Sequence, residues 1–231
     1  MSKSMTSATP SILSYPEGYL PDSDGTPMAE TDPHRKQMVY SLNALEERYF
    51  DVPDTYVSGN IFVYYRDKTG NLTSISPDIF VVHGVTKKDR RYYQVEEEGK
   101  APDAVIELTS SDTRMNDLVT KRLIYAHMGV QEYFIYDPYS EALRPALRGF
   151  RLERGKFVPM TGARLRSEVL EMDLVLEHGM LQLYLARTGE RLRSYRELAA
   201  ATREAENRAR QVEAENAHLR EELAKLMESK K

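Results

Sequence analysis

Two carboxylates in this sequence lie within runs of apolar residues that are typical of buried β-strands. Asp78 is expected in a strand that continues through the apolar residues 79–82, and Glu107 lies within the apolar stretch 105–108. Burying a carboxylate without a partner is costly, and two of them on neighbouring strands repel each other. A divalent cation between them offsets this cost, and carboxylate oxygens suit Mg²⁺ or Mn²⁺. The residue types therefore predict that Asp78 and Glu107 bind a metal ion.

A basic side chain is the next requirement, because a positive charge stabilises the charge that develops in a reaction at such a site. Side chains alternate along a strand, so residue 109 shares a face with Glu107, but this residue is Thr109. Lys121 is the other source of charge, since it lies on the predicted helix 113–128, four residues after Asp117. Both helix residues border an apolar stripe formed by Met115, Leu118, Val119, Arg122, Leu123 and Ala126. An ordinary helical pair of Asp117 and Lys121, worth about 0.2–0.5 kcal/mol, is the competing interpretation.

The elements that hold these residues follow from apolar spacing and turn signals. Residues 1–31 are rich in Ser, Thr, Pro, Gly and Asp, and they are expected to form a flexible lead-in. Asp32-Pro33 is typical of a helix start, with Asp32 as the N-cap, and the helix is expected to extend to about Tyr49. Strands are predicted at residues 56–66, 72–82, 104–109 and 133–136, with a hairpin around Arg154-Gly155. Together these elements predict a mixed α/β domain over residues 32–189.

The C-terminal region, residues 190–231, differs in kind and carries a heptad repeat. Leu198, Ala205, Val212, Leu219 and Leu226 are spaced by seven, and Thr202, Ala209, Asn216 and Leu223 follow the first four of them by four residues. A 3,4 spacing that is sustained without Gly or Pro predicts a coiled coil. We expect a homodimer through residues 195–231 with parallel helices, because a seam asparagine such as Asn216 favours two helices in register. A solvated single helix and antiparallel pairing are the alternatives.

Composition restricts the class of protein without identifying it. The chain has 231 residues, 41% of them hydrophobic and 29% charged, which is the balance of a globular protein. It has no cysteine, no apolar run that could cross a membrane and no apolar signal segment, so a cytoplasmic protein without disulfides is expected. The five histidines lack the spacing of a zinc site, and glycine-rich phosphate loops are absent from the sequence. The net charge of −4 argues against uniform affinity for nucleic acid but permits basic residues to cluster on one face.

Several segments in a fixed order resemble the Uma2 family, a group of proposed restriction endonucleases in the PD-(D/E)XK nuclease superfamily. They are Pro77-Asp78, residues 101–113, Asp117, Lys121, Tyr125, residues 129–133 and Asp137-Pro138. The resemblance covers about residues 30–185, and the order and spacing of the segments make it specific. It implies a restriction-endonuclease-like α/β fold, in which a mixed central sheet is flanked by helices.

The resemblance also implies a site and an activity. Asp78 and Glu107 match the acids that bind the metal ion, Mg²⁺ or Mn²⁺, and are expected to be catalytic. Thr109 stands where the superfamily usually has its lysine, and members of this family supply that lysine from the helix, which here is Lys121. The implied activity is that of an endonuclease that hydrolyses DNA phosphodiester bonds. The alternative is a catalytically silent DNA-binding or scaffold protein that associates through its coiled coil, because fold alone does not determine function.

Overall fold

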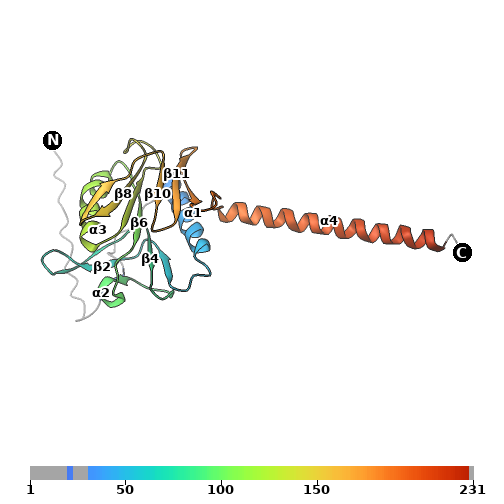
Figure 1. Cartoon of the computed structure of the whole chain (residues 1–231), viewed down its shortest axis with the longest axis horizontal. Helices are drawn as coiled ribbons and strands as arrows, with labels where there is room; N and C mark the ends of the chain where they lie inside the picture. The colour runs from blue at the N-terminus through green and yellow to red at the C-terminus, as the bar shows by residue number, and fades with distance from the viewer. Residues whose placement is uncertain (1–19, 23–30, 229–231) are drawn as a thin grey trace, which may run out of the picture.

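The computed structural model describes residues 20–22 and 31–228, and a six-stranded mixed sheet forms its centre (Figure 1). In spatial order the strands are β1 (Thr55–Ser58), β4 (Ile79–His83), β6 (Ala104–Leu108), β7 (Glu132–Tyr136), β8 (Leu147–Glu153) and β9 (Lys156–Pro159). β6 and β7 are parallel, and the other neighbouring pairs of this sheet are antiparallel. The predicted mixed central sheet is confirmed, as are the strand that holds Glu107 and the hairpin around Arg154-Gly155.

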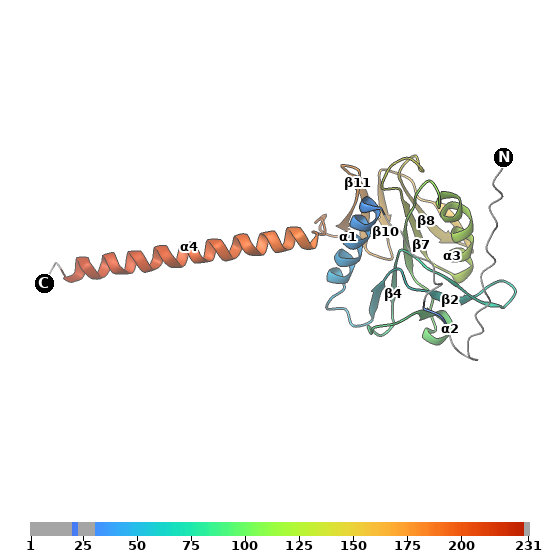
Figure 2. The same cartoon turned by 180° about the vertical axis from the view of Figure 1, so that it is seen from behind.

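Alternation of side chains along these strands divides the interior into two cores. On one face, buried residues of the sheet pack with α1 (Asp32–Arg48). On the other face, Val105 packs in a cluster that includes Tyr125 of α3 (Arg122–Met128). Figures 1 and 2 show α1 and α3 on opposite sides of the central sheet. Glu107 shares its face with Val105, so its carboxylate points toward the side of α3.

Two three-stranded sheets flank the central one. The first contains β10 (Arg164–Ser167), β11 (Met172–Glu177) and β12 (Met180–Leu185), and the second contains β3 (Leu72–Ile75), β2 (Val63–Arg66) and β5 (Tyr93–Gln94), which leads into the short helix α2 (Val95–Glu98). The side chain of Gln37 joins α1 to β12, because its amide nitrogen donates to the carbonyl oxygen of Leu181 at 2.9 Å and its amide oxygen accepts from the Leu181 N–H at 3.2 Å. The sequence patterns did not predict β10, β11 or β12.

The predicted strands 56–66 and 72–82 are wrong in extent, because each divides into two strands that belong to different sheets. Asn60 interrupts the first with a positive φ of 52°, and its N–H donates to the carbonyl oxygen of Pro77 at 2.9 Å. Pro77 interrupts the second, since it has no N–H to pair within a sheet. Asp78 therefore lies in the bend directly before β4 rather than inside a strand.

The predicted helix 113–128 forms, but part of it is a π-helix. Helical residues begin at 114, pass through the π-helical segment η1 (Asn116–Lys121) and continue as α3. Gly129 ends the helix as predicted, in the left-handed conformation with φ of 87°. π-Helical turns are rare within α-helices and often occur at functional sites. This segment carries Lys121, one of the candidate site residues.

The flexible lead-in expected for residues 1–31 lies mostly outside the described residues. Pro21 belongs to the described part, and its carbonyl oxygen accepts a hydrogen bond from the Tyr64 hydroxyl at 2.5 Å. At the start of α1 the structure places Thr31 at the N-cap, and Asp32 lies in the first turn. The predicted cap is thus wrong by one residue, which is the usual uncertainty of a helix end.

The C-terminal helix α4 (Tyr195–Glu228) has 34 residues and projects away from the side of the protein where α1 and β11 lie (Figures 1 and 2). The long helix predicted from the heptads is therefore present, and its side chains are largely exposed in the single chain. No helix within residues 20–22 and 31–228 is both long and apolar enough to span a membrane.

Gly59→Ala should destabilise the protein, because an alanine Cβ at this position would lie 2.0 Å from the carbonyl oxygen of Asp78. One backbone segment must then move away from the other, and overpacking of this kind costs about 1–3 kcal/mol. Urea unfolding measures the loss, and Ser58→Ala, one residue earlier, is the control. A variant as stable as the wild type would contradict this close approach.

Candidate active site

The sheet register brings Asp78 and Glu107 together. β4 and β6 pair Ile79 with Ile106 in an antiparallel arrangement, so Asp78, one residue earlier, lies opposite Glu107, one residue later. The Asp78 N–H donates to Oε2 of Glu107 at 3.4 Å, and the Leu108 N–H donates to Oδ2 of Asp78 at 2.7 Å. The Glu107 side chain is fully buried, whereas Asp78 keeps 17% of its side-chain surface exposed. The two acids therefore lie side by side at one end of the sheet, next to solvent on the Asp78 side.

Two side chains from the helix satisfy the buried carboxylate of Glu107. The Tyr125 hydroxyl donates to Oε1 at 2.5 Å, and the Lys121 ammonium donates to Oε2 at 2.8 Å. Tyr125 and Lys121 are four residues apart, so they reach the same side of the helix. The structure thus brings Lys121 to the acids, as expected from the sequence. Tyr125 entered the sequence analysis only as part of the family resemblance, and it is the second partner of Glu107.

Asp117 is a third carboxylate of this cluster, and only 2% of its side chain is exposed. Its Oδ1 lies 3.1 Å from the Lys121 ammonium, and its Oδ2 accepts a hydrogen bond from the Thr109 hydroxyl at 2.6 Å. The helical pair of Asp117 and Lys121 therefore forms, but it is buried, and Lys121 also contacts Glu107. Thr109, which stands in the usual lysine position, holds the acid that in turn holds Lys121.

The structure corrects the expected orientation of this helix. Three apolar residues predicted on its buried side are exposed by 62%, 43% and 56% of their surface, namely Met115, Val119 and Leu123. The helix residues that face the sheet are Asp117, Lys121 and Tyr125. The physical reason is that the buried carboxylate of Glu107 needs donors and a counter-charge, which an apolar stripe would not supply.

Burial and mutual repulsion shape the ionisation of the cluster. Burial, only partly opposed by the Lys121 ammonium, raises the pKa of Glu107 to about 8, and the charges of Asp78 and Asp117 add to the rise. Burial also raises the pKa of Asp78. Burial acts to lower the pKa of Lys121, but the three carboxylates outweigh it and hold that pKa above its ordinary value. With three carboxylates and one ammonium, the fully ionised cluster has a net charge of 1 − 3 = −2.

His34 is a nearby residue that the sequence analysis set aside. It lies in the first turn of α1, and its Nε2 is 4.0 Å from Oδ1 of Asp78. The spacing of the histidines in the chain held no signal for it, because 78 − 34 = 44 residues separate it from Asp78. Only the packing of α1 against β4 brings the two side chains together.

Carboxylate oxygens make this cluster chemically suitable for a hard cation. Oδ1 of Asp117 is buried and has only the Lys121 ammonium beside it, and the net charge of −2 of the ionised cluster is the complement of a divalent ion. Across the described residues, no three His, Cys, Asp or Glu side chains converge in the arrangement of a preformed metal site. Asp78 and Glu107 thus fit a divalent cation by donor type and charge, and Asp78 provides the side that is open to solvent.

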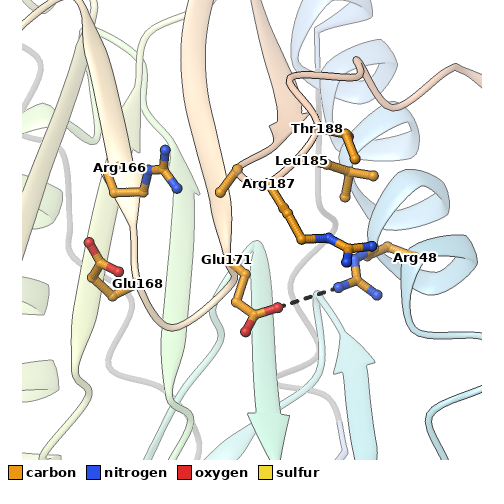
Figure 3. A pocket seen from close by; sticks show the side chains of 8 residues that line it. Arg48, Arg166, Glu168, Glu171, Leu185, Arg187 and Thr188 are labelled. Carbon is orange, nitrogen blue, oxygen red and sulfur yellow. Dashed lines mark ion pairs between the residues drawn. The ribbon is translucent and has the colours of Figure 1, made fainter.

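A separate pocket of about 490 Å³ lies between the end of α1, the turn before β11 and the end of β12 (Figure 3). Arg48, Arg166 and Arg187 line it together with Glu168 and Glu171, and Arg48 pairs with Glu171 at 3.6 Å. None of the acids opposite Lys121 lines this pocket. The candidate active site is therefore the buried acid cluster, which lies at the other end of α1.

The fold and the cluster together define an α/β protein with a charged, nearly closed site at the end of a mixed sheet. The model of the Uma2 family, described as "Putative restriction endonuclease", matches residues 21–185, which is more than half of the chain. The chain belongs to the Uma2 family. The resemblance found in the sequence is confirmed.

Solved structures include similar proteins. One of them is a crystal structure of "a putative nuclease belonging to DUF820" from Anabaena variabilis, with 15% sequence identity and a TM-score of 0.47. The match covers 65% of this chain and 84% of the other. No curated protein matches the chain.

The raised pKa of Glu107 predicts that the protein loses stability as the pH rises. Between the ordinary pKa of 4.5 and the folded-state pKa of about 8, the folded protein holds a proton that the unfolded chain has lost. The free energy of unfolding should therefore fall across this window in metal-free buffer. Glu107→Gln should flatten this dependence in denaturant titrations, while Glu141→Gln, at an exposed position, serves as the control. Equal slopes for wild type and Glu107→Gln would contradict the assignment.

Proposed function

We propose that this protein is a metal-dependent endonuclease that hydrolyses DNA phosphodiester bonds. The observation that carries the proposal is the buried contact of Lys121 with Glu107 at 2.8 Å, beside Asp78 on the neighbouring strand. Membership of the Uma2 family supports the reaction class. A catalytically silent module has no need of a buried acid beside a second acid, since Lys121 only partly opposes the cost of burial and repulsion at Glu107.

Asp78 and Glu107 are the residues that would hold Mg²⁺ or Mn²⁺, and both are proposed as catalytic. When bound, such an ion polarises the scissile phosphate and lowers the pKa of a bound water. Asp78 supplies the solvent-facing carboxylate, and its Oδ2 is kept in place by the N–H of Leu108. Glu107 supplies the buried carboxylate, and the Tyr125 hydroxyl keeps that group in a single orientation.

Lys121 is proposed as the catalytic cation. Its ammonium lies at the acid pair, where it can stabilise the negative charge that develops on a phosphate as water attacks. Asp117 is a positioning residue, because it holds the ammonium from the other side at 3.1 Å and is itself held by Thr109. The helix therefore supplies the charge that residue 109 does not carry.

We also propose that the protein is a homodimer joined through α4. The heptad residues Val212, Leu219 and Leu223 are exposed by 56%, 47% and 60% of their surface in the single chain. A row of apolar residues at this spacing is stable in water when a second helix covers it. The two copies would then be held together by a coiled coil that leaves the acid cluster at a distance.

Lys121→Gln should lower the rate of DNA cleavage by about 10²-fold, the scale expected when one electrostatic stabiliser is removed. Glutamine keeps a donor near Glu107 but removes the charge. The measurement is cleavage of mixed linear, supercoiled and single-stranded DNA with Mg²⁺ or Mn²⁺. Lys68→Gln, in an exposed turn, is the matched control.

Two outcomes of that experiment have opposite meanings. Glu107→Ala and Lys121→Gln both failing to cleave, with Lys68→Gln active, would support the site. A Lys121→Gln protein that cleaves at the wild-type rate would remove Lys121 from the mechanism. Thr109→Lys added to Lys121→Gln should restore part of the rate, since it returns an ammonium from the strand.

Leu219→Asp should convert the dimer to a monomer, because it places a charge in the apolar seam of α4. Sedimentation equilibrium at micromolar concentration measures the mass. Ala217→Asp introduces the same charge on the outer side of the helix and should leave the dimer intact. A wild-type protein that sediments as a monomer would disprove the homodimer without bearing on the nuclease site.

A further inference from the structure

The surface around the start of α4 is exposed and apolar. We call this surface the base patch, and its members are Val39 (52% exposed), Phe50 (72%), Met180 (43%), Tyr195 (73%) and Leu198 (38%). Large exposed apolar side chains that gather in one place are typical of a protein–protein interface. Tyr195 stands seven residues before Thr202, so it occupies the preceding position of the same heptad row. The coiled-coil seam thus continues from α4 into the base patch.

Two pockets lie on either side of Tyr195 and differ in charge. One has a volume of about 590 Å³ and is lined by Arg35, which pairs with Asp32 at 2.7 Å, and by Lys36, from the N-terminal half of α1. The other has a volume of about 220 Å³ and is lined by Glu46 and Glu47, from the C-terminal half of α1, together with Arg193. The start of α4 therefore meets the middle of α1, between a basic half and an acidic half.

The crossing of α1 and α4 determines which charges of two copies would face each other in a symmetric dimer. In both Figure 1 and Figure 2, α1 runs across the axis of α4, so its two halves lie on opposite sides of that axis. A two-fold axis parallel to α4 exchanges the two sides between copies. The basic half of α1 in one copy then faces the acidic half of α1 in the other.

We propose that a second copy of this chain pairs with α4 in a parallel arrangement, and that the interface continues onto the base patch. This proposal rests on the proposed homodimer, keeps the parallel orientation expected from the sequence, and adds the extent of the interface. Arg35 and Lys36 of each copy lie near the partner's Glu46 and Glu47. The apolar side chains between these charges are covered by the same residues of the partner, as in any interface built around a two-fold axis.

The charges that flank the seam of α4 favour the same orientation. One seam row of α4 contains Ala209 and Asn216. In a parallel pair, the residue directly before a position of this row faces a residue of the partner whose number is higher by five. This rule brings Arg208 opposite the partner's Glu213, and Glu215 opposite the partner's Arg220. Both pairs are of opposite charge, and symmetry makes each occur twice. Within its own chain, Arg208 also contacts Glu204, one turn earlier.

An antiparallel pair would lose these contacts. With Leu198 level with Leu226 of the partner, the centre lies at residue 212, so Glu213 comes close to the partner's Glu213. In this register Asn216 lies level with Arg208 of the partner instead of another asparagine. The two base patches are then separated by the length of α4, which is about 50 Å for 34 residues. The base patch would stay exposed.

Cysteine crosslinking of the full chain tests the orientation, because the natural sequence has no cysteine. Thr202→Cys lies on the seam close to the base patch, and in a parallel dimer it should form an intermolecular disulfide under mild oxidation. Arg203→Cys points away from the seam and is the control. A dimer in which Thr202→Cys crosslinks no better than Arg203→Cys would overturn the parallel arrangement.

Charge reversal tests the extension onto α1. Lys36→Glu and Glu47→Lys should each raise the dimer dissociation constant about tenfold, since each change affects two symmetry-related contacts. The double variant, which swaps the charges, should restore wild-type affinity, and Lys68→Glu is the control for a distant site. Unchanged dissociation constants in a parallel dimer would refute the extension alone, whereas a monomeric wild type would refute the homodimer itself.

Discussion

The buried carboxylate of Glu107 is the group on which the arrangement of this protein depends. It lies in a central strand with no access to water, so neighbouring elements must supply its hydrogen bonds and its counter-charge. One helix provides both, through Tyr125 and Lys121. This need determines which side of the helix faces the sheet, and it explains why apolar residues such as Met115 are left in solvent.

The sequence was sufficient to single out Asp78, Glu107 and Lys121 as candidate site residues, which the structure brings together. The carboxylate of Glu107 within an apolar strand was one local signal, the predicted helix offered Lys121 across a gap of 14 residues, 121 − 107, and the family resemblance joined the two with Asp78. The orientation of the helix was not predictable from apolar spacing, because that spacing favoured the side that turned out to be exposed. His34 was not predictable either, since its approach to Asp78 depends on how α1 packs against the end of β4.

Errors in the strands have similar local causes. β-Branched and aromatic residues continue across the break at Asn60, so residues 56–66 resemble one long strand until the close approach of Gly59 to Asp78 is known. The sequence pattern did not predict β10, because arginines occupy the exposed positions of this strand. Two of them, Arg164 and Arg166, pair with Asp173 of the next strand at 2.9 and 2.7 Å. Such cross-strand charge pairs replace the apolar alternation by which strands are usually recognised.

The π-helical segment η1 places a limit on how this family can vary. A π-helical turn closes its hydrogen bonds over one more residue than an α-helical turn, so the number of residues within 116–121 sets how Lys121 and Tyr125 are turned toward Glu107. If that number changed, the Tyr125 hydroxyl would lose its hydrogen bond to Glu107, even though the sequence still contained every residue of the site. The contact between Tyr125 and Glu107 therefore depends on the length of this segment and not only on the identity of its residues.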